Sequence, residues 1–314
     1  MSSPLERLSA GALGWLGGNL DYFDPFSASA RSATHGKAKA ALELALLCHC
    51  AARLADPPEA LGGAGALVRK LWQDPDLPQL FSDVPKYAST YGLIYAALAP
   101  DGIDATQVRA TLARLDPEFL SPRGKSPYQR IEIRHYADKA GVRHTVEPYA
   151  ELLSHSPLVA FRAAGPGEAA SEDGAPEDGA PLTDPRAYAV THTAFYLGDF
   201  GRTAPGLDGG ALAHARDLVD RLLRHCVEHD RWDLAAELVL TQFILGSEPL
   251  DTPSGAAAVE CLVRAQRPDG AIPARSAALA AHPSAPGGEF FGKAYHTTLV
   301  TALMALIVSS PRRS

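Results

Sequence analysis

The sequence lacks the features that mark membrane, secreted and disulfide-rich proteins. It has no apolar run of roughly 18 residues, and its N-terminus has no basic region followed by an apolar one. It contains only 4 cysteines, Cys48, Cys50, Cys226 and Cys261, which do not have the spacing of a secreted scaffold. We therefore expect reduced thiols in the core of a cytoplasmic protein that has no membrane partner.

Positive charge is also scarce. The 29 lysines and arginines stand against 36 acidic residues, giving a formal net charge of -7, and no basic run could follow a phosphate backbone. This balance predicts no nucleic-acid partner.

Hydrophobic residues make up 46% of the 314 residues, which is enough for one large core. The sequence therefore predicts a single domain over residues 1–314.

One segment has too few apolar residues to join that core. Residues 164–183 are mostly Gly, Pro, Ala and acid, and the five residues EDGAP occur twice in succession, at 172–176 and 177–181. Such composition favours disorder. We expect a surface insertion here, with a functional lid as the alternative.

What the sequence does have is a repeated helical pattern. Segments that are apolar on nearly every side carry a thin polar stripe at i, i+4 spacing, which places the polar side chains one above another. These segments begin near His35, Lys86, Glu132, Tyr188, Asp233 and Lys293, roughly every fifty residues. Because a helix that is apolar all round belongs in a core, its polar stripe must meet water or polar partners. A wet central cavity would supply both.

Helices of a second kind alternate with these. They are amphipathic, with one charged face, and we expect them at about residues 5–17, 59–73, 104–116, 146–163, 211–229 and 253–267. Stacked helix pairs that each bury a face against their neighbours can close into a ring. The sequence therefore predicts an all-α fold, specifically an α6/α6 toroid in which outer and inner helices alternate.

In such a toroid the inner helices run in one direction, so their N-terminal halves meet at one rim. Histidines and carboxylates held there, close to helix N-termini, suit general acid–base chemistry or an anionic ligand. The predicted catalytic residues are His192, Glu237, His296, Asp199 and Tyr196, and the predicted substrate-binding residues are His35, Lys39, Tyr188, Asp233, Lys293 and His135. The alternative is a hydrogen-bonded polar network that only fills the ring.

His192 is the sharpest candidate. It lies in the stretch THTAFYLGDFG, residues 191–201, where polar and aromatic side chains crowd a buried helix. Asp199 follows two helical turns later on the same face, where it could orient a partner. The alternative role for His192 is a core histidine bonded to a carbonyl group.

Two histidine sets could bind zinc, although we expect no cofactor. His225 and His229 have i, i+4 spacing, but they end an outer helix, where histidine is favoured by the helix dipole. A set made of His192, Glu237 and His296 would be better buried.

Two C-terminal motifs resemble a known superfamily. Residues 266–273, QRPDGAIP, are similar to the Q-x-x-D-G turn that follows an outer helix in terpenoid cyclases and protein prenyltransferases. Residues 289–306, with Tyr295, His296 and Thr297, resemble the Y-H-T stretch that opens the last inner helix of prenyltransferase β subunits. The resemblance implies the same α6/α6 toroid.

The resemblance also implies a zinc ligand at His296, with an Asp and a Cys two residues apart on an earlier helix. Here Asp233 stands in the comparable place, but Ala235 stands where the Cys would be, and the Asp-rich D-x-D-D motif of squalene-type cyclases does not occur. Aromatic residues make up only 7% of the chain, which is a small number for a cavity whose aromatic lining would have to stabilise a carbocation.

From these patterns we expect an enzyme with a polar central pocket. It would carry out acid–base or Lewis-acid-assisted cyclisation, elimination or group transfer on a small or peptidyl metabolite. The Ala-, Gly-, Pro- and Arg-rich composition is typical of a bacterium with a GC-rich genome and fits specialised metabolism. The alternative is a non-catalytic protein that binds a ligand or docks a partner enzyme.

Overall fold

The fold is all-α. The computed structural model describes residues 3–29, 36–161, 183–274 and 287–311, and these ranges contain helices and no strand. His35 and residues 164–182 of the predicted acidic insertion lie outside these ranges.

The apolar helices with polar stripes form where the pattern predicts them. They are α3 (Lys37–Ala51), α5 (Ala88–Ala97), α7 (Pro127–Ala140), α10 (Asp184–Leu197), α12 (Trp232–Ile244) and α15 (Gly287–Val308). Almost every residue of α12 is buried, including its polar Glu237, Thr241 and Gln242. A helix buried on all sides is held by its neighbours rather than by an exposed polar face.

The amphipathic helices also form, with two departures from their predicted lengths: α6 ends at Leu112 rather than near residue 116, and the helix predicted at 146–163 is broken. They are α1 (Pro4–Gly18), α4 (Gly62–Gln73), α6 (Ala105–Leu112), α11 (Gly209–Glu228) and α13 (Pro253–Ala265). The predicted helix at 146–163 is instead broken into α8 (Tyr149–Leu152), a 3₁₀ turn at Leu153–His155 and α9 (Pro157–Ala160). The break falls at Ser156, whose backbone is extended because a proline follows it.

Side-chain caps fix several helix starts. Ser3 and Glu6 form a capping box at α1, and Ser126 and Gln129 form another at α7. Because of the second box, α7 begins at Pro127, five residues before Glu132, where the predicted polar stripe begins. This earlier start adds a further turn to the helix, which carries Tyr128.

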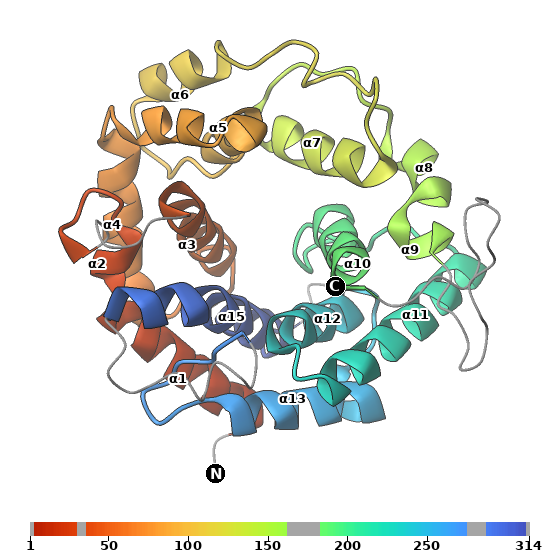
Figure 1. The fold of residues 1–314 in the computed structure, drawn as a ribbon. Coiled ribbons are helices and arrows are strands. Elements are labelled where there is room, and N and C mark those ends of the chain that lie inside the picture. The colour runs from red at the N-terminus through yellow and green to blue at the C-terminus, as the bar shows by residue number, and fades with distance from the viewer. Residues whose placement is uncertain (1–2, 30–35, 162–182, 275–286, 312–314) are drawn as a thin grey trace.

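The helices with polar stripes contact one another in a closed order. Along the chain α3 contacts α5, α5 contacts α7, α7 contacts α10, α10 contacts α12, α12 contacts α15, and α15 contacts α3. The amphipathic helices pack on these: α1 on α15, α4 on α3, α6 on α5, and both α11 and α13 on α12. In Figure 1, α12 and α15 accordingly lie inside α11, α13 and α1.

By length and composition alone, α15 could span a membrane, although it contains no unbroken apolar run of that length. Within the fold, 61% of its most apolar 18-residue window is buried. Its neighbours α1, α3 and α12 cover it. Core helices of this kind meet the same length and hydropathy criteria as membrane spans.

The turn after α13 depends on a glycine. Gly270 has a φ of +92°, and its amide donates to the carbonyl of Arg267 at 2.8 Å. A Cβ atom on Gly270 would overlap the backbone carbonyl of Gly11 in α1. Gln266 Nε2 donates to the carbonyl oxygen of Leu8 at 3.1 Å and so ties the same turn to α1. The Q-x-x-D-G motif thus joins the chain's C-terminal part to its first helix.

We expect Gly270→Ala to destabilise the protein strongly, because the new methyl group meets both a left-handed backbone and the α1 backbone. The matched control is Gly102→Ala, since Gly102 has a φ of +79° but open space around it. Urea unfolding should show a loss of about 3 kcal/mol for Gly270→Ala and about 1 kcal/mol for the control. Equal losses would contradict the close approach of the turn to α1.

Candidate functional site

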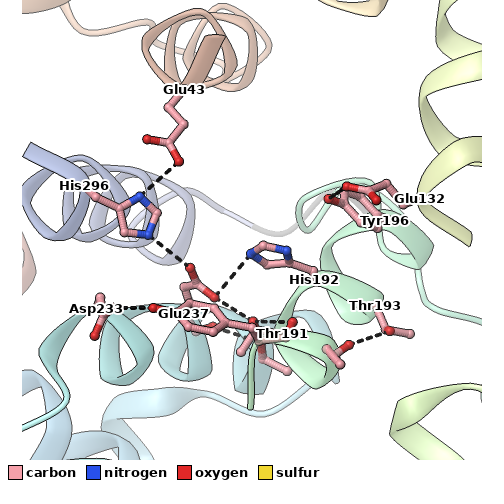
Figure 2. A network of polar contacts seen from close by, with 12 residues as sticks. Glu43, Glu132, Thr191, His192, Thr193, Tyr196, Asp233, Glu237 and His296 are labelled. Carbon is pink, nitrogen blue, oxygen red and sulfur yellow. Dashed lines mark hydrogen bonds and ion pairs between the residues drawn. The ribbon is translucent and has the colours of Figure 1, made fainter. Parts of the chain in front are cut away.

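A buried carboxylate, Glu237 of α12, lies at the centre of a polar network. Its side chain is only 2% exposed, and Thr191 of α10 donates a hydrogen bond of 2.6 Å to its Oε2. Two imidazoles share the carboxylate: His192 Nε2 lies 3.6 Å from Oε2, and His296 Nε2 lies 3.8 Å from Oε1. Figure 2 shows the two rings approaching Glu237 from α10 and α15.

The network extends from His296 to α3. His296 Nδ1 lies 3.1 Å from Oε1 of Glu43, and Lys39 Nζ lies 3.4 Å from the same oxygen. His296 therefore stands between two carboxylates, Glu43 and Glu237 (Figure 2). Helices α3, α12 and α15, which are distant in sequence, are joined by this series of charges.

On its other side the network extends to α7. The Tyr128 hydroxyl lies 3.1 Å from His192 Nδ1, so each ring nitrogen of His192 has a partner. The Tyr128 ring stacks on Tyr196, whose hydroxyl donates to Glu132 at 2.9 Å. Three helices thus set the position of His192.

The two central carboxylates are held in the charged form. Burial alone would raise the pKa of Glu43, but His296 and Lys39 outweigh it and lower this pKa to about 2. Burial likewise opposes ionisation of Glu237, yet the charges of His192 and His296 and the hydrogen bond from Thr191 lower its pKa. Both groups therefore remain ionised at neutral pH.

The same pairing favours the protonated form of the two histidines. Burial acts to lower the pKa of His192, but the charge of Glu237 outweighs it and raises this pKa. Burial is similarly outweighed at His296, where Glu43 is the main cause of a raised pKa. Glu132 differs from the other acids, because burial dominates there and raises its pKa.

The two imidazoles are partly exposed to solvent. The His192 side chain is 31% exposed and that of His296 is 25% exposed. Even so, removal from water is the largest single influence on the pKa of each ring. A side chain that is surrounded by protein and still reached by solvent can meet a small molecule, whereas Glu237 behind it cannot.

The structure brings several other predicted residues to this network or next to it. Lys39 joins it through Glu43, and Tyr196 joins it through Tyr128. Tyr188 donates a hydrogen bond to Asp233, one helical turn before His192 and Glu237 on α10 and α12. This hydrogen-bonded pair therefore lies next to the network, on the N-terminal side of His192 and Glu237.

Other predicted residues lie elsewhere. Asp199 pairs with Arg53, Lys139 and Arg202 beyond the C-terminal end of α10, rather than orienting His192. Lys293 is about half exposed and pairs with Glu289 on its own helix.

His135 is buried, its Nδ1 lies 3.1 Å from the Tyr196 carbonyl oxygen, and burial lowers its pKa to about 4. It is therefore a core histidine of the kind considered as the alternative for His192. His229 Nδ1 lies 2.9 Å from the His225 carbonyl oxygen, in keeping with a role at the end of α11.

Four members of the network were not among the predicted site residues: Tyr128, Glu132, Thr191 and Glu43. Glu43 stands on the polar stripe of α3, four residues after Lys39, and this spacing could have identified it. Thr191 directly precedes His192. Tyr128 precedes the stripe of α7, and only the S-P-x-Q capping signal at residues 126–129 could have placed it on that helix.

These residues do not fit the zinc site that the prenyltransferase resemblance implies. Ala235 is fully buried and offers no ligand atom, and Asp233 is engaged by Tyr188. Over the described ranges, no group of three or more His, Cys, Asp or Glu side chains is placed to hold a metal ion. The side chains of His192, Glu237 and His296 are accordingly not placed to hold one together.

We expect a ¹⁵N–¹H NMR titration of the histidines to separate two classes. His192 and His296 should titrate above the ordinary value of 6.5, whereas His135 and His49 should titrate near 4. The raised pair stabilises the fold fully below the unfolded pKa of about 6.5, and this contribution is lost as pH rises through the folded pKa. Titration of His192 below 6.5 would contradict the assigned charges.

Comparison with known proteins gives a family and no function. No curated protein matches the chain in sequence. A family model covers residues 9–306, which include every residue of the Glu237 network. The chain therefore belongs to the family described as Domain of unknown function (DUF6895).

Proposed function

We propose that this protein is an enzyme that uses the Glu237 network for general acid–base catalysis on a small or peptidyl metabolite. The single observation that carries the proposal is the pair of partly exposed imidazoles, His192 and His296, that share one buried carboxylate. General acid–base catalysis requires a proton donor that the substrate can reach. Here the imidazole is partly exposed to solvent, and the carboxylate of Glu237 that supports it is buried.

The proposal includes the finer fold prediction, an α6/α6 toroid of the kind found in terpenoid cyclases and prenyltransferases. It is supported by the closed order of contacts among the polar-striped helices and by the amphipathic helices packed against them. In a toroid the polar stripes face the middle of the ring. This arrangement agrees with the contacts of Glu43, Glu237 and His296 across α3, α12 and α15.

In the proposed reaction His192 is the general acid. Its imidazolium gives the Nδ1 proton to the Tyr128 hydroxyl, which at the same time passes its own proton to a leaving group or to a developing oxyanion on the substrate, and the neutral ring later takes a proton back by the same route. Glu237 stays ionised throughout, because its pKa is lowered, and it orients the ring and stabilises its positive charge.

The remaining residues have supporting roles in this scheme. Tyr128 holds the second ring nitrogen, and burial raises the pKa of its phenol, so it remains a neutral hydrogen-bond partner. His296 contributes a fixed positive charge that favours a developing anion. Cyclisation, elimination and group transfer can each include a proton transfer, and this set could carry it out.

The alternative is a non-catalytic protein whose imidazoles bind an anion or whose surface docks a partner enzyme. It differs from the enzyme in one respect that can be measured: binding would leave the ligand chemically unchanged. Each imidazole already faces a carboxylate that raises its pKa and makes it a weaker proton donor, which is the observation in favour of a non-catalytic protein.

A metabolite-turnover assay tests the proposal. The wild-type protein, His192→Asn and His229→Asn would each be incubated with a small-molecule extract, and the extracts compared by mass spectrometry. His229 is the matched control, because it lies at the exposed end of α11.

We expect compounds that are consumed by the wild type and by His229→Asn, but at a rate at least about 100-fold lower by His192→Asn. Extracts that remain identical with all three proteins would contradict catalysis. Equal consumption by His192→Asn would remove His192 from the mechanism.

A further inference from the structure

A cavity lies between α3 and the amphipathic helix outside it, α4 (Figure 1). Its volume is about 440 Å³, and its third wall is the segment that follows α5, from Leu98 to Asp101. Ligand pockets in proteins commonly have volumes of roughly 300–1,000 Å³ and mainly apolar walls. A cavity of about 150 Å³ already holds benzene. The space between α3 and α4 is therefore large enough for a molecule larger than benzene.

Short side chains keep this cavity open. Helix α3 lines it with Ala45 and Ala51, and α4 lines it with Gly62 and Gly65. A Cβ atom on either glycine would meet no other group within 4 Å, and neither glycine has a positive φ. Alanine would therefore fit at both positions and would favour the helix more than glycine does. The two glycines thus leave space free while weakening the helix.

The cavity and the Glu237 network lie on opposite sides of α3. The network uses Lys39 and Glu43, whereas the cavity is lined by Ala45, Cys48 and His49. Successive residues of a helix are rotated by about 100°, so Ala45 is about 200° round the helix from Glu43. A molecule in the cavity therefore does not contact the proposed catalytic groups.

The charged groups around the cavity have partners or lie at its mouth. Arg53 is bound by Asp199, and Arg69 donates from Nη1 to the Asp101 carbonyl oxygen at 2.8 Å. Arg69 and Asp101 have opposite charges, and both are exposed. An ionised group on a ligand would lose its water inside the cavity without gaining a counter-charge. The cavity therefore favours a neutral molecule.

His49 is the polar group that such a molecule would meet. Its Nε2 lies 3.3 Å from Nη1 of Arg53, and because a guanidinium only donates, this ring nitrogen accepts and Nδ1 carries the proton. Burial, followed by repulsion from Arg53, lowers the pKa of His49 to about 4, so the ring is neutral at neutral pH. Among the described residues, Nδ1 has no hydrogen-bond partner. His49 thus offers one neutral N–H donor.

We propose that this cavity binds a neutral, mainly apolar molecule with one hydrogen-bond-accepting oxygen, such as a medium-chain alcohol or ketone. The apolar chain packs against Leu61, Val68 and Leu98, and the oxygen accepts from Nδ1 of His49. The site goes beyond the proposed acid–base function and does not depend on it. The structural alternative is a water-filled gap between α3 and α4.

Calorimetry with 1-octanol and the full chain at neutral pH tests the proposal. We expect saturable binding with a dissociation constant of about 1 mM or tighter. Gly65→Met puts a long side chain into the open space beside α4 and should weaken binding at least about tenfold. Gly14→Met is the matched control, because Gly14 is an exposed glycine of α1 with equally open surroundings, and it should bind 1-octanol as the wild type does.

Two comparisons test the chemistry of the ligand. Octanoate, which has the same chain with a charged end, should bind the wild type at least about tenfold more weakly than 1-octanol. His49→Phe keeps a ring but removes the donor, and it should weaken binding of 1-octanol about fivefold.

Methyl NMR signals locate the ligand. The signals of Ala45 and Val68 should shift with 1-octanol, while the ring signals of His192 stay unchanged. No binding of 1-octanol would identify a water-filled gap and overturn the site. Equal or tighter binding of octanoate, unchanged binding by Gly65→Met or His49→Phe, or shifts centred on His192 would also overturn it.

Discussion

The buried carboxylate of Glu237 is the constraint on which the rest of the structure depends. A carboxylate that is 2% exposed can remain ionised only if positive charge or hydrogen-bond donors replace the water it has lost. Thr191, His192 and His296 supply these groups from two other helices. The charge on Glu237 therefore fixes how α10 and α15 are placed around α12.

The same constraint explains the protonation of the imidazoles and their suitability for catalysis. Neither ring would keep its proton at neutral pH if burial acted alone, because burial lowers the pKa of both. Pairing with Glu237 and Glu43 reverses this effect. The result is a set of charges that depend on one another, close to a surface that a small molecule can reach.

Much of this arrangement could be predicted from the sequence, because helical periodicity determines which side chains share a face. His192, Glu237 and His296 were placed on polar stripes of buried helices, and the structure joins them. Side-chain pairing between helices could not be predicted from periodicity. Asp199 shares a face with His192 in sequence, yet its left-handed backbone turns it toward Arg53 and Lys139. The capping box at Ser126 and Gln129, and not the polar stripe, places Tyr128 on α7. The fourth amphipathic helix is broken because Pro157 disfavours helical geometry at Ser156, although the apolar pattern continues through it.

A double-mutant cycle on Glu237 and His192 tests the central claim most directly. Urea unfolding at pH 6 would be measured for the wild type, Glu237→Gln, His192→Asn and the double variant. If the buried carboxylate and the imidazolium sustain each other's charge, the losses will not add, and the coupling free energy will be about 1–3 kcal/mol. Losses that add to within about 0.5 kcal/mol would show that the two groups do not depend on each other, and would contradict the account.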